Sequence, residues 1–180
     1  DAFSNIFSDK PNKKYFDNDD TSVNVCRGIT YFEDILQNSY IFYGVGSKLF
    51  KVNSKNGEPD FNFGNNGFID LHTGLGENST SLFVSMTSPG LIFDNLIIVG
   101  SSVSEGNPAA KGNIRAFDAN TGDLVWIFNT IPEIGEDGYD TYDDPNAYKR
   151  LGGANAWAGL TLDEKRGIVY APTGLSLIHI

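Results

Sequence analysis

Short runs of β-forming residues, separated by tight turns, recur along most of the chain and limit the folds available to it. The first copy has three such runs, at residues 28–32, 40–44 and 48–52, followed by the turn dipeptide Asn56-Gly57. The second copy has four, at residues 88–93, 96–101, 113–117 and 124–128, with a turn at Thr121-Gly122 before the last. A third copy begins with residues 156–161 and 168–171. Short runs bounded by Gly, Asn and Asp are typical of antiparallel strands joined by turns.

The repeat predicts an all-β fold built from four-stranded blades. The turns that end in Gly57 and Gly122 lie 65 positions apart, a spacing that suits one blade of a β-propeller with long insertions. We therefore expect a partial propeller in residues 26–174, with about two complete blades and the start of a third. Residues 1–25 are polar and lack periodicity, so we expect an irregular leading segment. Residues 175–180 do not continue the pattern, and we expect them to be a non-native tail.

Charge and composition exclude some kinds of partner. The formal net charge is −10, which argues against a nucleic-acid partner because contacts with phosphates need a basic face. Cys26 is the only cysteine, so the chain cannot form an internal disulfide, and we expect this residue to be a buried, small apolar side chain. No apolar run approaches the roughly 18 residues that a membrane span requires.

One turn carries a motif whose parts have clear physical roles. Residues 116–126 follow the order Ala-x-Asp-x-x-Thr-Gly-x-x-x-Trp. Asp118 can accept hydrogen bonds from N–H groups of the turn, Gly122 allows a positive φ, and Trp126 can pack against the next blade. This string resembles the tryptophan-docking motif of the PQQ-dependent (quinoprotein) dehydrogenases, in particular the membrane-bound members that oxidise glucose or quinate. The resemblance implies that the chain comes from an eight-bladed propeller that binds pyrroloquinoline quinone (PQQ).

An earlier copy of the motif is degenerate, with Asn53 in place of the aspartate and Phe61 in place of the tryptophan. Non-catalytic propellers, such as outer-membrane assembly lipoproteins, use similar repeats. A scaffold without enzymatic activity is therefore the alternative function, and three further matches favour the dehydrogenases over it.

The first match is residues 26–31, which resemble the family's Arg-Gly-x-x-Tyr segment and imply that Arg27 holds PQQ. The cofactor is a polycarboxylate, and a guanidinium binds a carboxylate through two parallel hydrogen bonds. The match is partial. Methanol-oxidising relatives carry two adjacent cysteines near this segment, and membrane-bound glucose dehydrogenases carry a histidine shortly before the arginine, where this chain has Val23, Asn24 and Val25. The missing histidine weakens the assignment to glucose.

The second match is residues 100–105, which are similar to the family's Gly-Ser-Ser-x-x-Glu element. The resemblance implies that Ser102, Val103 and Ser104 present hydroxyl and backbone N–H groups to PQQ. It also implies that Glu105 is a metal ligand. Hard cations prefer oxygen donors, so the metal ion would be Ca²⁺, Mg²⁺ or a lanthanide.

The third match is residues 152–157, which resemble the segment whose tryptophan lies flat against the quinone. Here the resemblance implies that Trp157 stacks on PQQ and that Asn155 faces the cofactor. A planar ring system stacks well on an indole. Thr87 matches a residue that supplies a hydroxyl to PQQ in relatives, although the register leaves Ser88 as an alternative.

Together the resemblances imply an enzyme that oxidises a hydroxyl group of a sugar, polyol or alcohol and passes the electrons to ubiquinone or cytochrome c. They imply a position on the periplasmic face, with any inner-membrane anchor outside this chain. The family's catalytic base is an aspartate on a later blade, so we expect no catalytic residue here. Glucose, other aldoses, quinate and simple alcohols all remain open as substrates.

Overall fold

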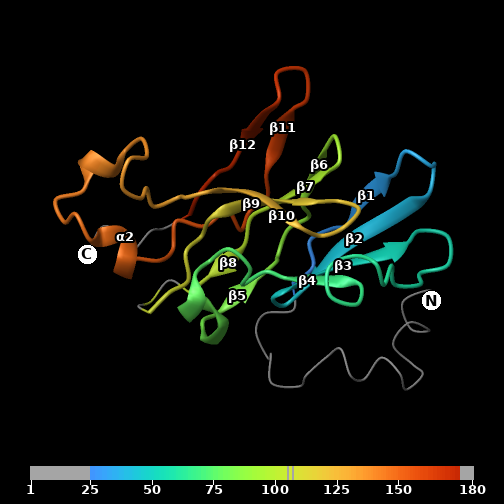
Figure 1. Ribbon diagram of the computed structural model, residues 1–180, viewed down its shortest axis with the longest axis horizontal. Helices are drawn as coiled ribbons and strands as arrows, with labels where there is room; N and C mark the ends of the chain where they lie inside the picture. Colours follow the sequence, from blue (N-terminus) through green and yellow to red (C-terminus); the bar gives the residue numbers. More distant parts are fainter. Residues whose placement is uncertain (1–24, 105, 107, 175–180) are drawn as a thin grey trace.

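The computed structural model describes residues 25–104, 106 and 108–174 (Figure 1). Almost all of the expected leading segment, the tail 175–180 and the candidate metal ligand Glu105 lie outside the described residues. Within them, no helix is both long enough and apolar enough to cross a bilayer.

Two four-stranded antiparallel sheets make up most of the structure. The first has the order β1 (Thr30–Glu33), β2 (Ser39–Val45), β3 (Lys48–Asn53), β4 (Phe68–Asp70). The second, written from its first strand outward, is β6 (Leu91–Phe93), β7 (Leu96–Val99), β9 (Ile114–Asp118), β10 (Leu124–Phe128). Smaller elements are the pair β5 (Val84–Ser85) and β8 (Ser102–Val103), the hairpin β11 (Thr161–Asp163) and β12 (Ile168–Tyr170), the 3-10 turns η2 (Glu77–Ser81) and η3 (Tyr139–Thr141), and the short helix α2 (Ala147–Arg150). The predicted fold is confirmed: two blades are followed by the first hairpin of a third.

The long connections that follow the second and fourth strands of the blades begin at the same end of the sheets. Neighbouring strands are antiparallel, so the first and third strands of a blade begin at the same end at which the second and fourth finish. Strand β1 contacts β6, and the Thr30 hydroxyl donates to the Gly90 carbonyl over 2.8 Å, which places the starts of both first strands side by side. We call this the site end. It carries the connections 71–90, 100–113 and 129–160.

The docking motif has the geometry that its residues predict. Asp118 Oδ1 accepts hydrogen bonds from the backbone N–H groups of Asn120 and Thr121, at 2.8 and 2.9 Å. Gly122 has a φ of 83°. Trp126 packs against the buried cluster of Ile98, Ile114, Ala116 and Ala156, and Leu160 and Val169 of the third blade pack against the same cluster, which therefore joins the two blades.

At the opposite end of the sheets, the turn of the second blade also contacts the first. The Gly64 N–H donates to the Thr121 carbonyl over 2.8 Å, and a Cβ on Gly122 would lie 2.7 Å from the Gly64 backbone nitrogen. Gly122→Ala is therefore expected to destabilise the protein by about 2 kcal/mol, through left-handed backbone strain and through the clash.

A matched control separates these two effects. Gly135 has a φ of 88°, but open space surrounds its Cα, so Gly135→Ala adds strain alone and should lower the melting temperature less. Thermal unfolding of both variants tests this explanation, and equal losses of stability would contradict the close approach at Gly64.

The first blade departs from the prediction at its fourth strand. Phe61 was expected to replace the docking tryptophan, but its side chain is 58% exposed and the fourth strand begins only at Phe68. The prediction was wrong because residues 54–67 make successive turns with left-handed backbone at Gly64, Asn66 and Gly67. Phe63 is the buried aromatic instead, and it packs edge-on against Phe42 with 5.3 Å between ring centroids.

Candidate cofactor site

Three segments that precede the first strands of consecutive blades meet at the site end. Arg27 precedes β1, Thr87 precedes β6 and Trp157 precedes β11. The Arg27 N–H donates to the Thr87 carbonyl over 3.1 Å, and the Thr87 hydroxyl donates to the Trp157 carbonyl over 2.9 Å. Residues 130 positions apart are thus linked through two hydrogen bonds, and each blade contributes one of the three segments.

The side chains of Arg27 and Trp157 lie against each other. The guanidinium carbon of Arg27 is 5.3 Å from the centroid of the indole, and the tryptophan is 43% exposed. Arg27 is also exposed, and among the described residues no carboxylate forms an ion pair with it. Within the described part of the chain, the pair therefore offers a cation without a carboxylate partner beside an accessible aromatic surface.

The hydroxyls of Thr87 and Ser88, the two alternatives at this position, both donate to the Trp157 carbonyl, over 2.9 and 2.7 Å. Thr87 is buried and Ser88 half-buried, and both line a narrow crevice, too small to admit a water molecule, together with Ser101, Ala156 and Trp157. The two hydroxyls thus hold the backbone of Trp157 in place.

Cys26 is exposed and not buried as expected, because residues 25–29 run along the surface before β1 begins.

The residues predicted from the Gly-Ser-Ser element form a second group next to the first. Ser102 and Val103 form β8, which pairs with β5 only two residues before Thr87. The Val103 side chain is buried in the core, and its carbonyl accepts a 3.4 Å hydrogen bond from Asn155 Nδ2. Ser104 Oγ accepts from the Gly106 N–H over 3.2 Å. The side chains of Val103 and Asn155 are thus engaged within the protein, while Ser102 stays half-buried.

Sequence reasoning missed one charged residue at this end. Arg115 lies in β9 between Ile114 and Ala116, is fully buried, and donates to the Ser101 hydroxyl at the floor of the crevice. An arginine inside an otherwise apolar strand was the available signal, because a long cation is rarely buried without a specific partner.

The composition of the site fits a planar polyanion. The exposed guanidinium of Arg27 supplies the charge for a carboxylate, and the adjoining indole supplies a flat surface for a ring. The family model that describes the β-propeller domain of PQQ-dependent glucose, ethanol and alcohol dehydrogenases matches residues 8–178. The chain belongs to the PQQ-dependent dehydrogenases.

Individual relatives agree with this membership. The chain is 33% identical over 162 residues to the glycerol dehydrogenase large subunit of Gluconobacter thailandicus, covering 84% of this chain and 21% of that protein. It is 35% identical over 139 residues to the quinate/shikimate dehydrogenase (quinone) of Acinetobacter baylyi, covering 76% and 17%. The chain therefore spans about a fifth of the length of the curated relatives it matches.

The fold is shared with solved members of this group. A quinohemoprotein alcohol dehydrogenase from Pseudomonas putida superposes with a TM-score of 0.66 at 18% identity, over 84% of this chain and 21% of the other. At this level of identity the likeness concerns the fold alone. It agrees with the two blades and the hairpin described above.

Proposed function

We propose that this chain is part of the propeller of a longer PQQ-dependent dehydrogenase and that it supplies one wall of the cofactor site. The observation that carries the proposal is the meeting of Arg27, Thr87 and Trp157 from three consecutive blades. A non-catalytic scaffold needs blade docking but has no use for an exposed cation next to an exposed indole, so the assembly-lipoprotein alternative is disfavoured.

Each residue of this wall has a distinct role in the proposal. Arg27 would bind a carboxylate of PQQ, and Trp157 would pack against its ring system while Thr87 and Ser88 hold the tryptophan backbone in place. Ser102, Ser104 and Asn155 would line the same side. When bound, PQQ would accept the two electrons removed from the substrate.

The metal ion and the catalytic base are proposals from the sequence. Glu105 would give one carboxylate oxygen to Ca²⁺, Mg²⁺ or a lanthanide. A structural neighbour is described as a europium-containing methanol dehydrogenase, which supports including a lanthanide. Among the described residues no group of three acidic, histidine or cysteine side chains could hold a metal by itself, so the other ligands and the aspartate base would come from later blades.

The proposed substrate is a hydroxyl group of a polyol, sugar or alcohol. Relatives named for glycerol, quinate or shikimate, and glucose all match the chain at 33–35% identity. We propose ubiquinone or cytochrome c as electron acceptor and the periplasmic face as location, with any membrane anchor elsewhere in the protein.

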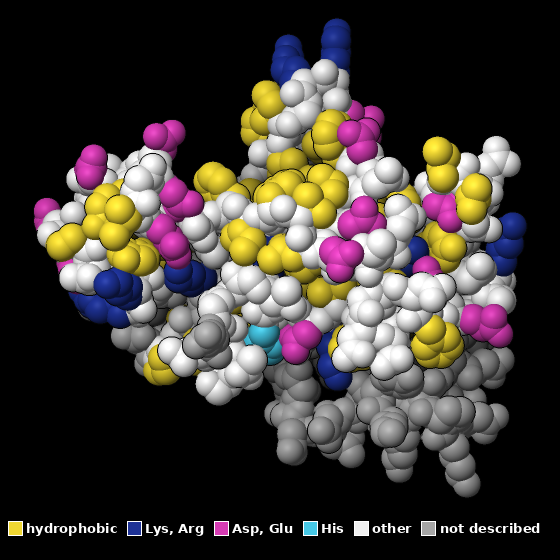
Figure 2. Space-filling view, in the orientation of Figure 1, with side chains coloured by type: hydrophobic (Ala, Val, Ile, Leu, Met, Phe, Trp, Pro, Cys, Tyr) yellow, Lys and Arg dark blue, Asp and Glu magenta, His cyan; other side chains and the backbone are white. Residues whose placement is uncertain are grey.

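Exposed strands support the view that further blades follow. Figure 2 shows hydrophobic side chains across the middle of the molecule and on the projecting β11–β12 hairpin. The exposed hydrophobic residues of these strands include Val125 and Phe128 of β10, at 52 and 64% exposed, and Ile168 and Tyr170 of β12, at 41 and 54%. In a closed propeller the remaining strands of the third blade would cover β12.

Reconstitution tests the proposal. The complete apoprotein, supplied with PQQ and Ca²⁺, is expected to reduce an artificial electron acceptor with at least one of glycerol, quinate, glucose and ethanol, whereas the 180-residue chain alone should show no turnover. Assays in which either PQQ or Ca²⁺ is left out provide the control. If the complete protein neither binds PQQ nor turns over any substrate, the dehydrogenase proposal fails and the scaffold takes its place.

A further inference from the structure

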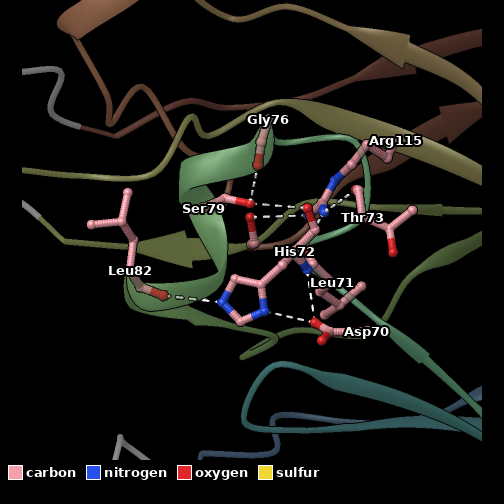
Figure 3. Close-up of polar contacts among 9 residues, drawn as sticks. Asp70, Leu71, His72, Thr73, Gly76, Ser79, Leu82 and Arg115 are labelled. Carbon is pink, nitrogen blue, oxygen red and sulfur yellow. Dashed lines mark hydrogen bonds and ion pairs between the residues drawn. The ribbon is translucent and has the colours of Figure 1, made fainter.

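The buried guanidinium of Arg115 links two loops of the site end, residues 71–73 and the loop that starts after β7, through hydrogen bonds. Its Nη1 donates to the carbonyls of Leu71 and Thr73, the latter over 3.2 Å, and its Nη2 donates to Ser101 Oγ over 3.3 Å. Figure 3 shows the arginine reaching into the loop that follows β4. The arginine thus connects residues 71–73, between the blades, with residue 101 at the end of β7.

The charge of Arg115 is not neutralised by a direct partner. It is fully buried, and among the described residues no carboxylate forms an ion pair with it; its Nε has no hydrogen-bond partner. Burial lowers the pKa of Arg115 to about 10, although the charge of Asp70 opposes this effect. Asp70 itself is held by His72, whose Nδ1 lies 2.6 Å away. An uncompensated buried cation costs stability, so packing alone does not explain this residue.

Ser101 connects Arg115 to the crevice. Ser101 is 1% exposed and lines the crevice together with Thr87 and Trp157. The next two residues form β8, whose Val103 carbonyl binds Asn155. Any shift of Ser101 would therefore move the strand that leads to Ser102 and Ser104.

We propose that Arg115 is a positioning residue for the anionic cofactor: it holds Ser101 and the strand β8 in place from below and sets a positive charge behind the crevice. The inference rests on the proposed function, since the anion in question is PQQ. Arg115 does not contact the cofactor in this proposal. Its guanidinium donors bridge Ser101 and two backbone carbonyls and so fix the backbone around Ser101 before the cofactor binds. A binding surface that is already ordered loses less conformational freedom on binding.

The test is a double-mutant cycle in the complete apoprotein, with the dissociation constant of PQQ measured by fluorescence titration in excess Ca²⁺. Arg115→Met is expected to raise this constant about tenfold, which is the size of losing one hydrogen bond with a charged donor. Ser101→Ala should raise it about threefold on its own. In the Arg115→Met background Ser101→Ala should add almost nothing, because the link is already broken. Arg115→Lys keeps the charge but not the fork and should fall between parent and Arg115→Met.

Ile97→Val is the matched control, because Ile97 is a fully buried residue of strand β7 in the same blade. It should lower the melting temperature and leave the PQQ dissociation constant unchanged. If Arg115→Met also lowers only the melting temperature, or if its effect adds in full to that of Ser101→Ala, the inference is wrong. Should Arg115→Met not fold, an unchanged dissociation constant for Ser101→Ala and Arg115→Lys overturns it equally. Failure of the parent protein to bind PQQ would instead refute the proposed function.

Discussion

Arg27→Ala is expected to weaken PQQ binding about 100-fold in the complete protein, equivalent to about 2.7 kcal/mol. Within the described residues, Arg27 is exposed and has no carboxylate partner. Its charge is therefore free to bind the cofactor, and its loss leaves a ligand carboxylate without a donor. Arg27→Lys should recover part of the affinity, because it keeps the charge but not the planar pair of donors.

The effect should be specific to this position and independent of the metal. Arg150→Ala removes an equal charge from an exposed ion pair with Asp144 and should leave the PQQ dissociation constant near that of the parent. Raising the Ca²⁺ concentration should not restore PQQ binding to Arg27→Ala. Titrations of the three proteins with PQQ check both statements, and parental affinity in Arg27→Ala would remove the central residue of the proposed site.

Glu105→Gln is expected to have an effect of at least similar size on the metal ion. The change keeps the size of the side chain but removes an anionic oxygen donor, and breaking such a pair in a partly buried site costs about 4 kcal/mol, or on the order of 1000-fold in affinity. Because mass action can compensate for a weaker site, high metal concentrations should restore part of the activity. This behaviour is the opposite of that expected for Arg27→Ala.

A metal titration of the reconstituted enzyme measures this directly. Glu164→Gln, in the exposed turn between β11 and β12 at the opposite end of the blade, removes the same charge and should titrate like the parent. If Glu105→Gln also shows the parental metal dependence, Glu105 is an ordinary loop residue, and the candidate site reduces to the Arg27, Thr87 and Trp157 segments.

The regular part of the fold was predictable because local signals and tertiary packing agree there. The run at residues 124–128 matches β10 at both ends, and the Asp118 turn has its expected hydrogen bonds. In the first blade the signals disagree. Phe61 has the right spacing for docking, yet the left-handed residues that follow it delay the strand and leave Phe63 in the core. Spacing alone cannot show which of two nearby aromatic residues will be buried.

The proximity of Arg27 and Trp157 was predictable from the sequence, but the residues that support them were not. Arg27 and Trp157 were found through resemblance, and the structure brings them together. Strands β5 and β8 have only two residues each, too few for a periodic pattern, so their pairing was not foreseen. Arg115 was missed although it interrupts an apolar strand, because two of its partners are backbone carbonyls of a loop more than forty positions earlier, and the sequence does not show which carbonyls a buried arginine will reach.

The division of the site among three blades has a thermodynamic consequence. A ligand that touches the segments before β1, β6 and β11 at once binds only when those blades are docked in register. By linkage, such a ligand stabilises the docked arrangement in proportion to the logarithm of its concentration over its dissociation constant. The bound cofactor would then stabilise the docking of the three blades at the site end. This stabilisation would offset the docking energy that is missing at the opposite end, where the docking motif of the first blade is degenerate.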